Sequence, residues 1–208
     1  FLIILNLSMP LLANPHIFSN LILSFTGVFI FMRYFRSQSI YSRWLWGIFL
    51  FSISLSALAD LLLFSGIVEL ESTKRIVDAG EMILGMVCVV VASWCLIMKL
   101  EPSKMLFGST LVFGGTLFYC VTWFEVEYVS TIINAFCIVV TLLICCLGLG
   151  NRQKSALWMI FSMMLFALST KSKVIPVPMH PIDLSHYLTA LAIVCIGWAI
   201  RDKYKILF

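Results

Sequence analysis

Charged residues are scarce in this sequence. Only 12% of its 208 residues are Asp, Glu, Lys or Arg, whereas 62% are hydrophobic. A soluble domain carries about 25% charged and about 45–50% apolar residues. A chain of this length cannot hide so much apolar surface in a water-soluble core. The composition therefore excludes a soluble globular protein and predicts a protein that is solvated by lipid.

Residues that mark common reaction chemistries are also scarce. The sequence has three histidines, too few for the stacked ligand pairs of a two-haem cytochrome. It lacks a Walker loop, a GxSxG elbow and an HExxH helix. Its seven cysteines all fall inside apolar runs and form no CxxC pair, so we expect small buried side chains rather than a redox or zinc-ribbon motif.

Long apolar runs are what the sequence has instead. In a bilayer the backbone must satisfy its own hydrogen bonds, so only helices or a closed barrel can cross. The runs are continuous and do not alternate, which favours helices of about 20 residues. The predicted fold is an all-α, polytopic transmembrane bundle of seven helices. The spans are predicted near 17–35, 43–65, 76–98, 104–124, 128–149, 155–170 and 182–200.

The loops between these spans are short, so we expect one transmembrane domain over residues 14–208. Residues 1–13 (FLIILNLSMPLLA) are apolar but shorter than a span. They fit the end of a signal-peptide-like segment, a helix lying at the interface or the tail of a truncated span. The sequence leaves these three interpretations open.

Basic residues divide unevenly between the two ends of the predicted spans. Because Lys and Arg are enriched in cytoplasmic loops, the richer set predicts an outside N-terminus and a cytoplasmic C-terminus. This asymmetry explains the net charge of +4 without a nucleic-acid partner. We expect an integral protein of a bacterial inner membrane or an endomembrane, surrounded by membrane lipid. The richer set is Arg33, Arg36, Arg43, Lys99, Lys104, Arg152, Lys154, Arg201, Lys203 and Lys205; the poorer set is Lys74, Arg75, Lys171 and Lys173.

Acidic and histidine residues gather at the predicted outer end. Asp60 interrupts an apolar run, where an ionised carboxylate costs about 2.5–3.5 kcal/mol. Such a residue usually faces the bundle interior and has a partner. Ser56 lies four residues before Asp60, and Asp78 and Glu81 are three residues apart, so each pair shares a helix face. These positions predict an outward-facing polar chamber lined by Asp60, Asp78, Glu81, Asp183 and His186.

Mixed carboxylate and imidazole ligands suit zinc, and a catalytic site leaves one position open for water. A second interpretation is that the acidic residues are hydrated groups in the first turn of a helix, where carboxylates satisfy free N–H groups and the helix dipole. His16 fits either the chamber or the membrane interface. The candidate metal ligands are His16, Asp60, Asp78, Glu81, His180 and His186.

Three local patterns accompany this arrangement. Ser19-Asn20 opens the first span in FSNLILSFTG, Ser56-xxx-Asp60 lies in the second, and His186 lies in HPIDLSHYLTAL at the last. The pattern resembles the seven-span lipid hydrolases that include alkaline ceramidases and, more distantly, adiponectin-receptor-like proteins. Members hold zinc inside the bundle with three histidines, an aspartate and a serine. The resemblance implies that Asp60 stands where members have a histidine and that His186 is a ligand of the last span.

Two classes of function follow from these observations. In the first, the protein is a metal-dependent hydrolase of a lipid or amphiphile, with Asp60 or Asp183 as general base and Ser56 assisting the oxyanion. In the second, the protein catalyses nothing and is either a seven-span sensor or receptor module or an accessory subunit of a membrane complex. The hydrolase and sensor interpretations both predict a small-molecule or lipid ligand that approaches from the outer side.

Overall fold

The computed structural model describes residues 15–36, 38–64, 71–124 and 127–205, and the apolar segment 1–13 lies outside them. All regular secondary structure in the described residues is helical, which confirms the all-α prediction. The helices are α2 (Pro15–Tyr34), α3 (Ile40–Phe64), α4 (Glu71–Gly80), the π-helix η2 (Glu81–Gly85), α5 (Met86–Ile97), α6 (Lys104–Trp123), α7 (Glu127–Leu147), α8 (Gln153–Ser169) and α9 (Pro181–Lys205), with 3-10 turns η3 (Gly148–Gly150) and η4 (Ser172–Val174).

Within these described residues, six helices are long and apolar enough to cross a membrane, which supports a multi-pass membrane protein. One of them is the continuous helix Glu71–Ile97, formed by α4, η2 and α5. The helix predicted as the sixth span, α8, is shorter, with 17 residues. Its Met159 and Met163 are fully buried, because α8 packs along α9.

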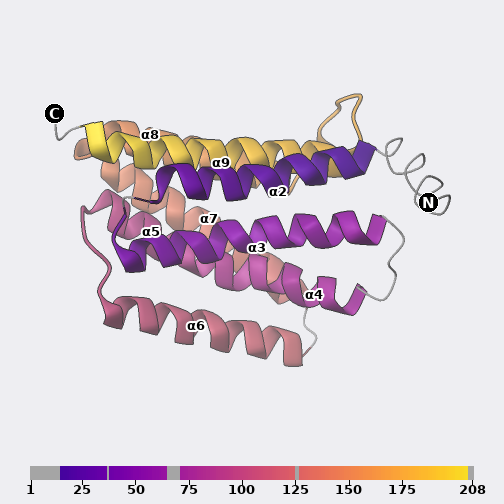
Figure 1. Cartoon of the computed structure of the whole chain (residues 1–208), viewed down its shortest axis with the longest axis horizontal. Helices are drawn as coiled ribbons and strands as arrows, with labels where there is room; N and C mark the ends of the chain where they lie inside the picture. Colours follow the sequence, from indigo (N-terminus) through magenta and orange to yellow (C-terminus); the bar gives the residue numbers. More distant parts are fainter. Residues whose placement is uncertain (1–14, 37, 65–70, 125–126, 206–208) are drawn as a thin grey trace, which may run out of the picture.

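The helices form a bundle in which α2, α8 and α9 lie together and α3 packs on α2 (Figure 1). Helix α5 packs against both α3 and α7. Helix α6 lies at the edge of the bundle (Figure 1), and in it only Thr110, Gly114 and Val121 are buried. Most of the α6 surface therefore faces outward, as expected for a helix in lipid.

Two glycines allow close helix contacts. A Cβ at Gly27 of α2 would collide with the side chain of Ser54, and one at Gly85 would lie 2.7 Å from the Oγ atom of Ser52. Both serines belong to α3. Helices in membranes associate through such small residues, because lipid provides no hydrophobic drive for their packing. The glycines hold α2 and η2 against the helix that carries Ser56 and Asp60.

The helix that carries Asp78 and Glu81 begins earlier than the sequence predicts. We expect a start near residue 76, with both carboxylates at its opening, whereas the helix begins at Glu71. Residues 71–75 (ESTKR) are polar, so hydropathy alone assigns them to a loop. Glu, Lys and Arg are nevertheless good helix formers, and an acidic residue favours the first turn. Asp78 and Glu81 therefore lie about two turns or more inside the helix.

Candidate functional site

A cavity of about 570 Å³ lies inside the bundle, and we call it the chamber. Side chains of α2, α3, α4, η2, α5, α7, α8 and α9 line it. Its polar lining includes three carboxylates, two lysines and one histidine, and its apolar lining consists of aliphatic, methionine and phenylalanine side chains. The charged or titratable lining residues are Asp60, Lys74, Asp78, Glu81, Lys173 and His186; the large apolar ones are Leu23, Phe49, Ile53, Met82, Met86, Ile138 and Phe166.

The structure brings five of the residues singled out in the sequence to this chamber: Ser56, Asp60, Asp78, Glu81 and His186. The other three lie together at the α2 side of α9, where Asp183 bonds to His16 and where the rings of His16 and His180 are in contact. The predicted set therefore separates into two neighbouring groups.

A lysine holds the first group together. Lys74 Nζ lies 2.8 Å from Asp60 Oδ1 and 2.8 Å from Asp78 Oδ2, and Ser56 Oγ donates a hydrogen bond to Asp78 Oδ1 at 2.7 Å. We call these four residues the lysine cluster. Their ionised side chains are 20–30% exposed, so the ion pairs lie at the chamber wall and not in open water. Asp60 thus has the partner that its apolar setting requires.

Sequence reasoning missed Lys74. As a basic residue, Lys74 counts only among those that predict the orientation of the protein in the membrane. Because it precedes the apolar run, it is also expected to lie in a loop. The available signal is its spacing: Lys74 lies four residues before Asp78, a distance at which opposite charges meet on one helix face. Its contact with Asp60 of α3 depends on how the two helices pack, which the sequence does not display.

Glu81 opens the π-helical segment within the long third helix. Single π-turns inside α-helices are rare, and those that occur are often found at functional sites. The wider turn redirects the neighbouring side chains. Glu81 lines the chamber beside the lysine cluster. The lining there contains three carboxylates and the single ammonium of Lys74, with Lys173 at an exposed position.

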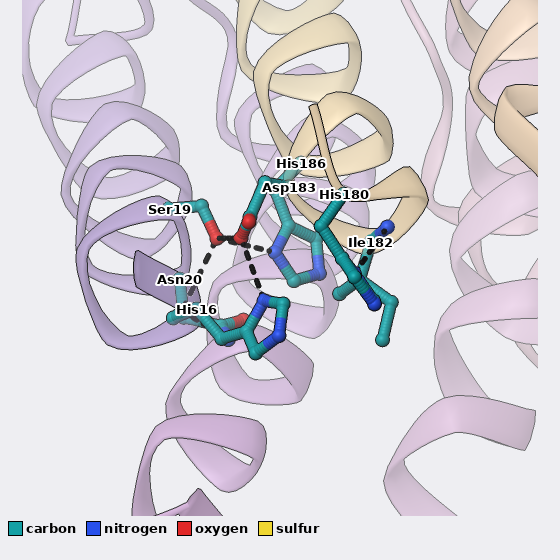
Figure 2. Close-up of polar contacts among 7 residues, drawn as sticks. All are labelled: His16, Ser19, Asn20, His180, Ile182, Asp183 and His186. Atoms are coloured by element: carbon teal, nitrogen blue, oxygen red, sulfur yellow. Dashed lines mark hydrogen bonds and ion pairs between the residues drawn. The ribbon is translucent and has the colours of Figure 1, made fainter. Parts of the chain in front are cut away.

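Ser19 is the centre of the second group (Figure 2). Its Oγ lies 2.6 Å from Asp183 Oδ1 and 3.1 Å from His186 Nδ1. His16 Nδ1 lies 3.0 Å from the same Asp183 oxygen. We call His16, Ser19, His180, Asp183 and His186 the histidine cluster. Ser19 is fully buried and Asp183 is 4% exposed, so these hydrogen bonds compensate the burial of the carboxylate.

The bonds of Ser19 favour one tautomer of His186. A serine hydroxyl has one O–H to donate, and Asp183 Oδ1 at 2.6 Å is a nearer acceptor than the His16 carbonyl oxygen at 3.1 Å. With the hydroxyl hydrogen directed to Asp183, Ser19 Oγ accepts from His186 in the tautomer that carries a hydrogen on Nδ1. In a neutral imidazole the other nitrogen, Nε2, is then the acceptor. His186 is also a chamber residue, so it connects the histidine cluster to the chamber.

His16, His180 and Asp183 form a group with the composition of a metal site. Each offers one ligand atom, and these atoms lie within 4.8 Å of one another. The His16 and His180 rings meet edge to face, with centroids 4.4 Å apart. The three residues come from the start of α2, the residue before α9 and the first turn of α9.

A second cavity, of about 580 Å³, adjoins the chamber between α4, α6 and α7. It shares Asp78, Met82 and Thr131 with the chamber lining. Its further lining residues include Ser72, Arg75, Ile76, Val121 and Ser130. The side cavity therefore lies between the chamber wall and α6, the helix whose surface is mostly outward-facing.

Fold and site together define a multi-pass helical membrane protein with an internal polar chamber and an adjacent His/Asp/His triad. The chain belongs to the family described as "Family of unknown function (DUF6962)", whose pattern matches residues 16–205. No curated protein and no solved structure matches the chain.

Proposed function

We propose that this protein binds a membrane amphiphile in the chamber. The observation that carries the proposal is the lining, which combines a charged part with a wall of aliphatic and aromatic side chains in one cavity of about 570 Å³. Ligand sites in proteins are typically concave and mostly apolar, with a few polar groups that fix the ligand's orientation. A polar head group matches the lysine cluster, and a hydrocarbon chain matches the apolar wall.

The side cavity supports entry from the bilayer. A lipid that leaves the membrane must pass between two helices, and the gap between α4, α6 and α7 is lined by residues common to both cavities. Met82 is partly exposed at this position, and methionine adapts its shape more readily than branched side chains do. The proposed route of an amphiphile into the chamber therefore runs through the side cavity, past Met82 and Thr131.

A blocking substitution tests the binding site. Thr131 is exposed on α7 and lines both cavities, so Thr131→Trp should fill the passage. Thr116→Trp is the matched control, because Thr116 is exposed on α6, where its hydroxyl bonds to the carbonyl of Val112. With palmitoyl lysophosphatidylcholine as probe, native mass spectrometry should detect binding to the wild type and the control. Binding should fall at least tenfold in Thr131→Trp; equal binding in all three proteins would refute the site.

We propose that the chamber end faces outward and that α8 also spans the membrane, which brings the number of spans in the described residues to seven. The connections at the opposite end of the bundle (Figure 1) carry the richer set of basic residues, and a span can have about 17 residues. In a cysteine-free background, Ser72→Cys should react with an impermeant reagent in intact cells, and Arg152→Cys only after permeabilisation. The reverse labelling would invert the orientation.

Hydrolysis of the bound amphiphile is a second candidate, favoured by the position of His186. Its Nε2 is an acceptor nitrogen in a residue of the chamber wall, and the Asp183–Ser19 pair holds the ring. His186 would take a proton from water as the water oxygen bonds to an ester or amide carbonyl carbon, then deliver it to the leaving oxygen or nitrogen. Zinc, which the resemblance to seven-span hydrolases implies, would supply an activated water when bound.

The residues assigned to this reaction from the sequence are engaged in other bonds. Ser56 donates its single O–H to Asp78, and Asp60 pairs with Lys74. Stabilising an oxyanion with Ser56, or taking a proton with Asp60, requires these bonds to break first.

Turnover distinguishes the two candidates. If the protein is a hydrolase, the wild type releases fatty acid from a lipid ester or amide, whereas His186→Ala does not, although it still binds the lysolipid. Binding without release in the zinc-loaded wild type would exclude hydrolysis of these probes and favour the sensor or subunit interpretation.

A further inference from the structure

The start of α2 and the start of α9 meet at two histidines and one aspartate. His16 and Asp183 are 167 residues apart in the sequence, yet Nδ1 of the first lies 3.0 Å from Oδ1 of the second. The exposed His180 completes the group, with its ring against that of His16 (Figure 2). No described lysine or arginine is recorded in an ion pair with Asp183, in contrast to the carboxylates of the lysine cluster.

The distances suit a small divalent cation. Zinc bonds to imidazole nitrogen and carboxylate oxygen at about 2.0–2.2 Å, which puts two tetrahedral ligand atoms about 3.3 Å apart. The separation of His16 Nδ1 and Asp183 Oδ1 is already close to that value, so a metal ion can replace the proton that the two atoms share. The ligand atoms of all three residues lie within 4.8 Å of one another. The ring nitrogen of His180 must therefore move by only part of that distance to reach a bound ion.

His180 is free to make this movement. Its Nδ1 accepts a long bond, 3.4 Å, from the backbone N–H of Ile182, and its exposed ring lies in the segment that leads into α9. Rotation of an exposed side chain costs little compared with the free energy of forming a metal–imidazole bond.

Buried residues around the group resemble the supporting shell of a metal site. Ser19 Oγ bonds to Asp183 at 2.6 Å, and Asn20 Nδ2 donates to the His16 carbonyl at 2.9 Å. Such outer contacts orient metal ligands and strengthen binding. Asn20 is fully buried, and its Oδ1 has no hydrogen-bond partner among the described residues. A ligand water on a bound ion is a donor of the kind that this buried oxygen needs.

We propose that His16, His180 and Asp183 form a divalent transition-metal site, for which zinc is the best match, and that the ion ties α2 to α9. Mixed nitrogen and oxygen ligands favour zinc over magnesium or calcium, which prefer oxygen alone. Three protein ligands leave a fourth position for water. The proposal is independent of amphiphile binding, because the three ligands are not chamber-lining residues.

Zinc titration of the purified, chelator-treated protein in detergent tests the site. We expect one zinc per chain by elemental analysis after removal of excess metal, and a rise in the unfolding temperature on zinc addition. His180→Ala should abolish both effects and leave the metal-free unfolding temperature unchanged, because the His180 side chain is exposed. Asp60→Asn is the matched control at the same end of the bundle and should retain the zinc.

Two results would overturn the proposal. One is a wild-type protein that retains no zinc after equilibration with the metal. The other is zinc that is kept in His180→Ala and lost in Asp60→Asn, which would locate the ion in the chamber. Lysolipid binding by the wild type and by His180→Ala separates this test from that of the proposed function, since failure of the metal site predicts normal lipid binding by both.

Discussion

The lysine cluster and the histidine cluster lie at the same end of the bundle and use carboxylates in opposite ways. In the lysine cluster, Asp60 and Asp78 share the ammonium of Lys74 at 2.8 Å each. In the histidine cluster, the buried Asp183 accepts from Ser19 and His16. The carboxylates of the lysine cluster are neutralised by an ammonium of the same chain, whereas the histidine cluster gathers imidazoles and one hydroxyl around a single carboxylate.

This difference decides where an ion can bind. A divalent metal at the lysine cluster would have to displace an ammonium that already satisfies two carboxylates, and one cation would then face another. At the histidine cluster the ion would replace a shared proton and gain neutral imidazole ligands. The number of carboxylates alone therefore does not predict a metal site. A carboxylate that already has an ammonium partner is a poor metal ligand, whereas one that is surrounded by imidazoles is a good one.

The largest effect should follow from removing that counter-charge. Lys74→Met keeps the length of the side chain but leaves Asp60 and Asp78 unpaired. Breaking a buried pair costs about 3–5 kcal/mol, and partial exposure should reduce this to about 2–4 kcal/mol here. Unfolding in detergent by a denaturing surfactant measures the loss. Arg75→Met, an exposed neighbour on α4, should change the free energy of unfolding by less than about 0.5 kcal/mol.

A Lys74→Met variant as stable as the wild type would contradict the view that the lysine neutralises Asp60 and Asp78. The triple change that adds Asp60→Asn and Asp78→Asn should recover much of the loss, because it removes the unpaired charges as well. If it recovers nothing, packing of the lysine stem accounts for the effect, and the ion pairs do not.

A smaller effect is expected in the histidine cluster. Ser19→Ala removes the 2.6 Å bond to Asp183 but no metal ligand, so zinc affinity should fall about 10–100-fold, as for other supporting residues. Competition against a coloured chelator measures the affinity. Ser54→Ala is the control, because that hydroxyl bonds to the carbonyl of Leu50 within α3; equal losses in both variants would argue against a supporting role for Ser19.

The smallest effect should come from Ser56→Ala. The variant removes the hydrogen bond to Asp78 while Lys74 keeps both carboxylates paired. A hydrogen bond to a charged group contributes about 1.5–3 kcal/mol, and the partial exposure of Asp78 should place the loss at the lower end of that range, below that of Lys74→Met. A loss as large as that of Lys74→Met would mean that the serine, and not the lysine, organises the cluster.

The sequence predicted the helices because only helices or a closed barrel can cross lipid, and long apolar runs without alternation favour helices. It also predicted a chamber lined by Asp60, Asp78, Glu81, Asp183 and His186; all of these except Asp183 line the cavity in the structure. An apolar run makes each charged interruption visible, and spacings of three and four residues assign it to a helix face. A residue's own surroundings in the sequence therefore carry information about its place on a helix, but the functional role of these residues stays a prediction.

The separation into two clusters could not be predicted. It depends on the contact of α2 with α9, which brings His16 to Asp183, and on the early start of α4, which brings Lys74 to Asp60. The first is a packing outcome between the two ends of the chain. The second was hidden because a polar first turn of a helix has the composition of a loop.

Photo-crosslinking tests the central claim, an amphiphile in the chamber, most directly. A lysolipid with a diazirine in its acyl chain is added to the protein in nanodiscs, irradiated, and its attachment sites are identified by mass spectrometry. We expect crosslinks at the chamber residues Ile53, Met86 and Ile138, and their loss in Thr131→Trp but not in Thr116→Trp. Crosslinks confined to outward-facing residues such as Val112, Phe113 and Phe136 would contradict the account.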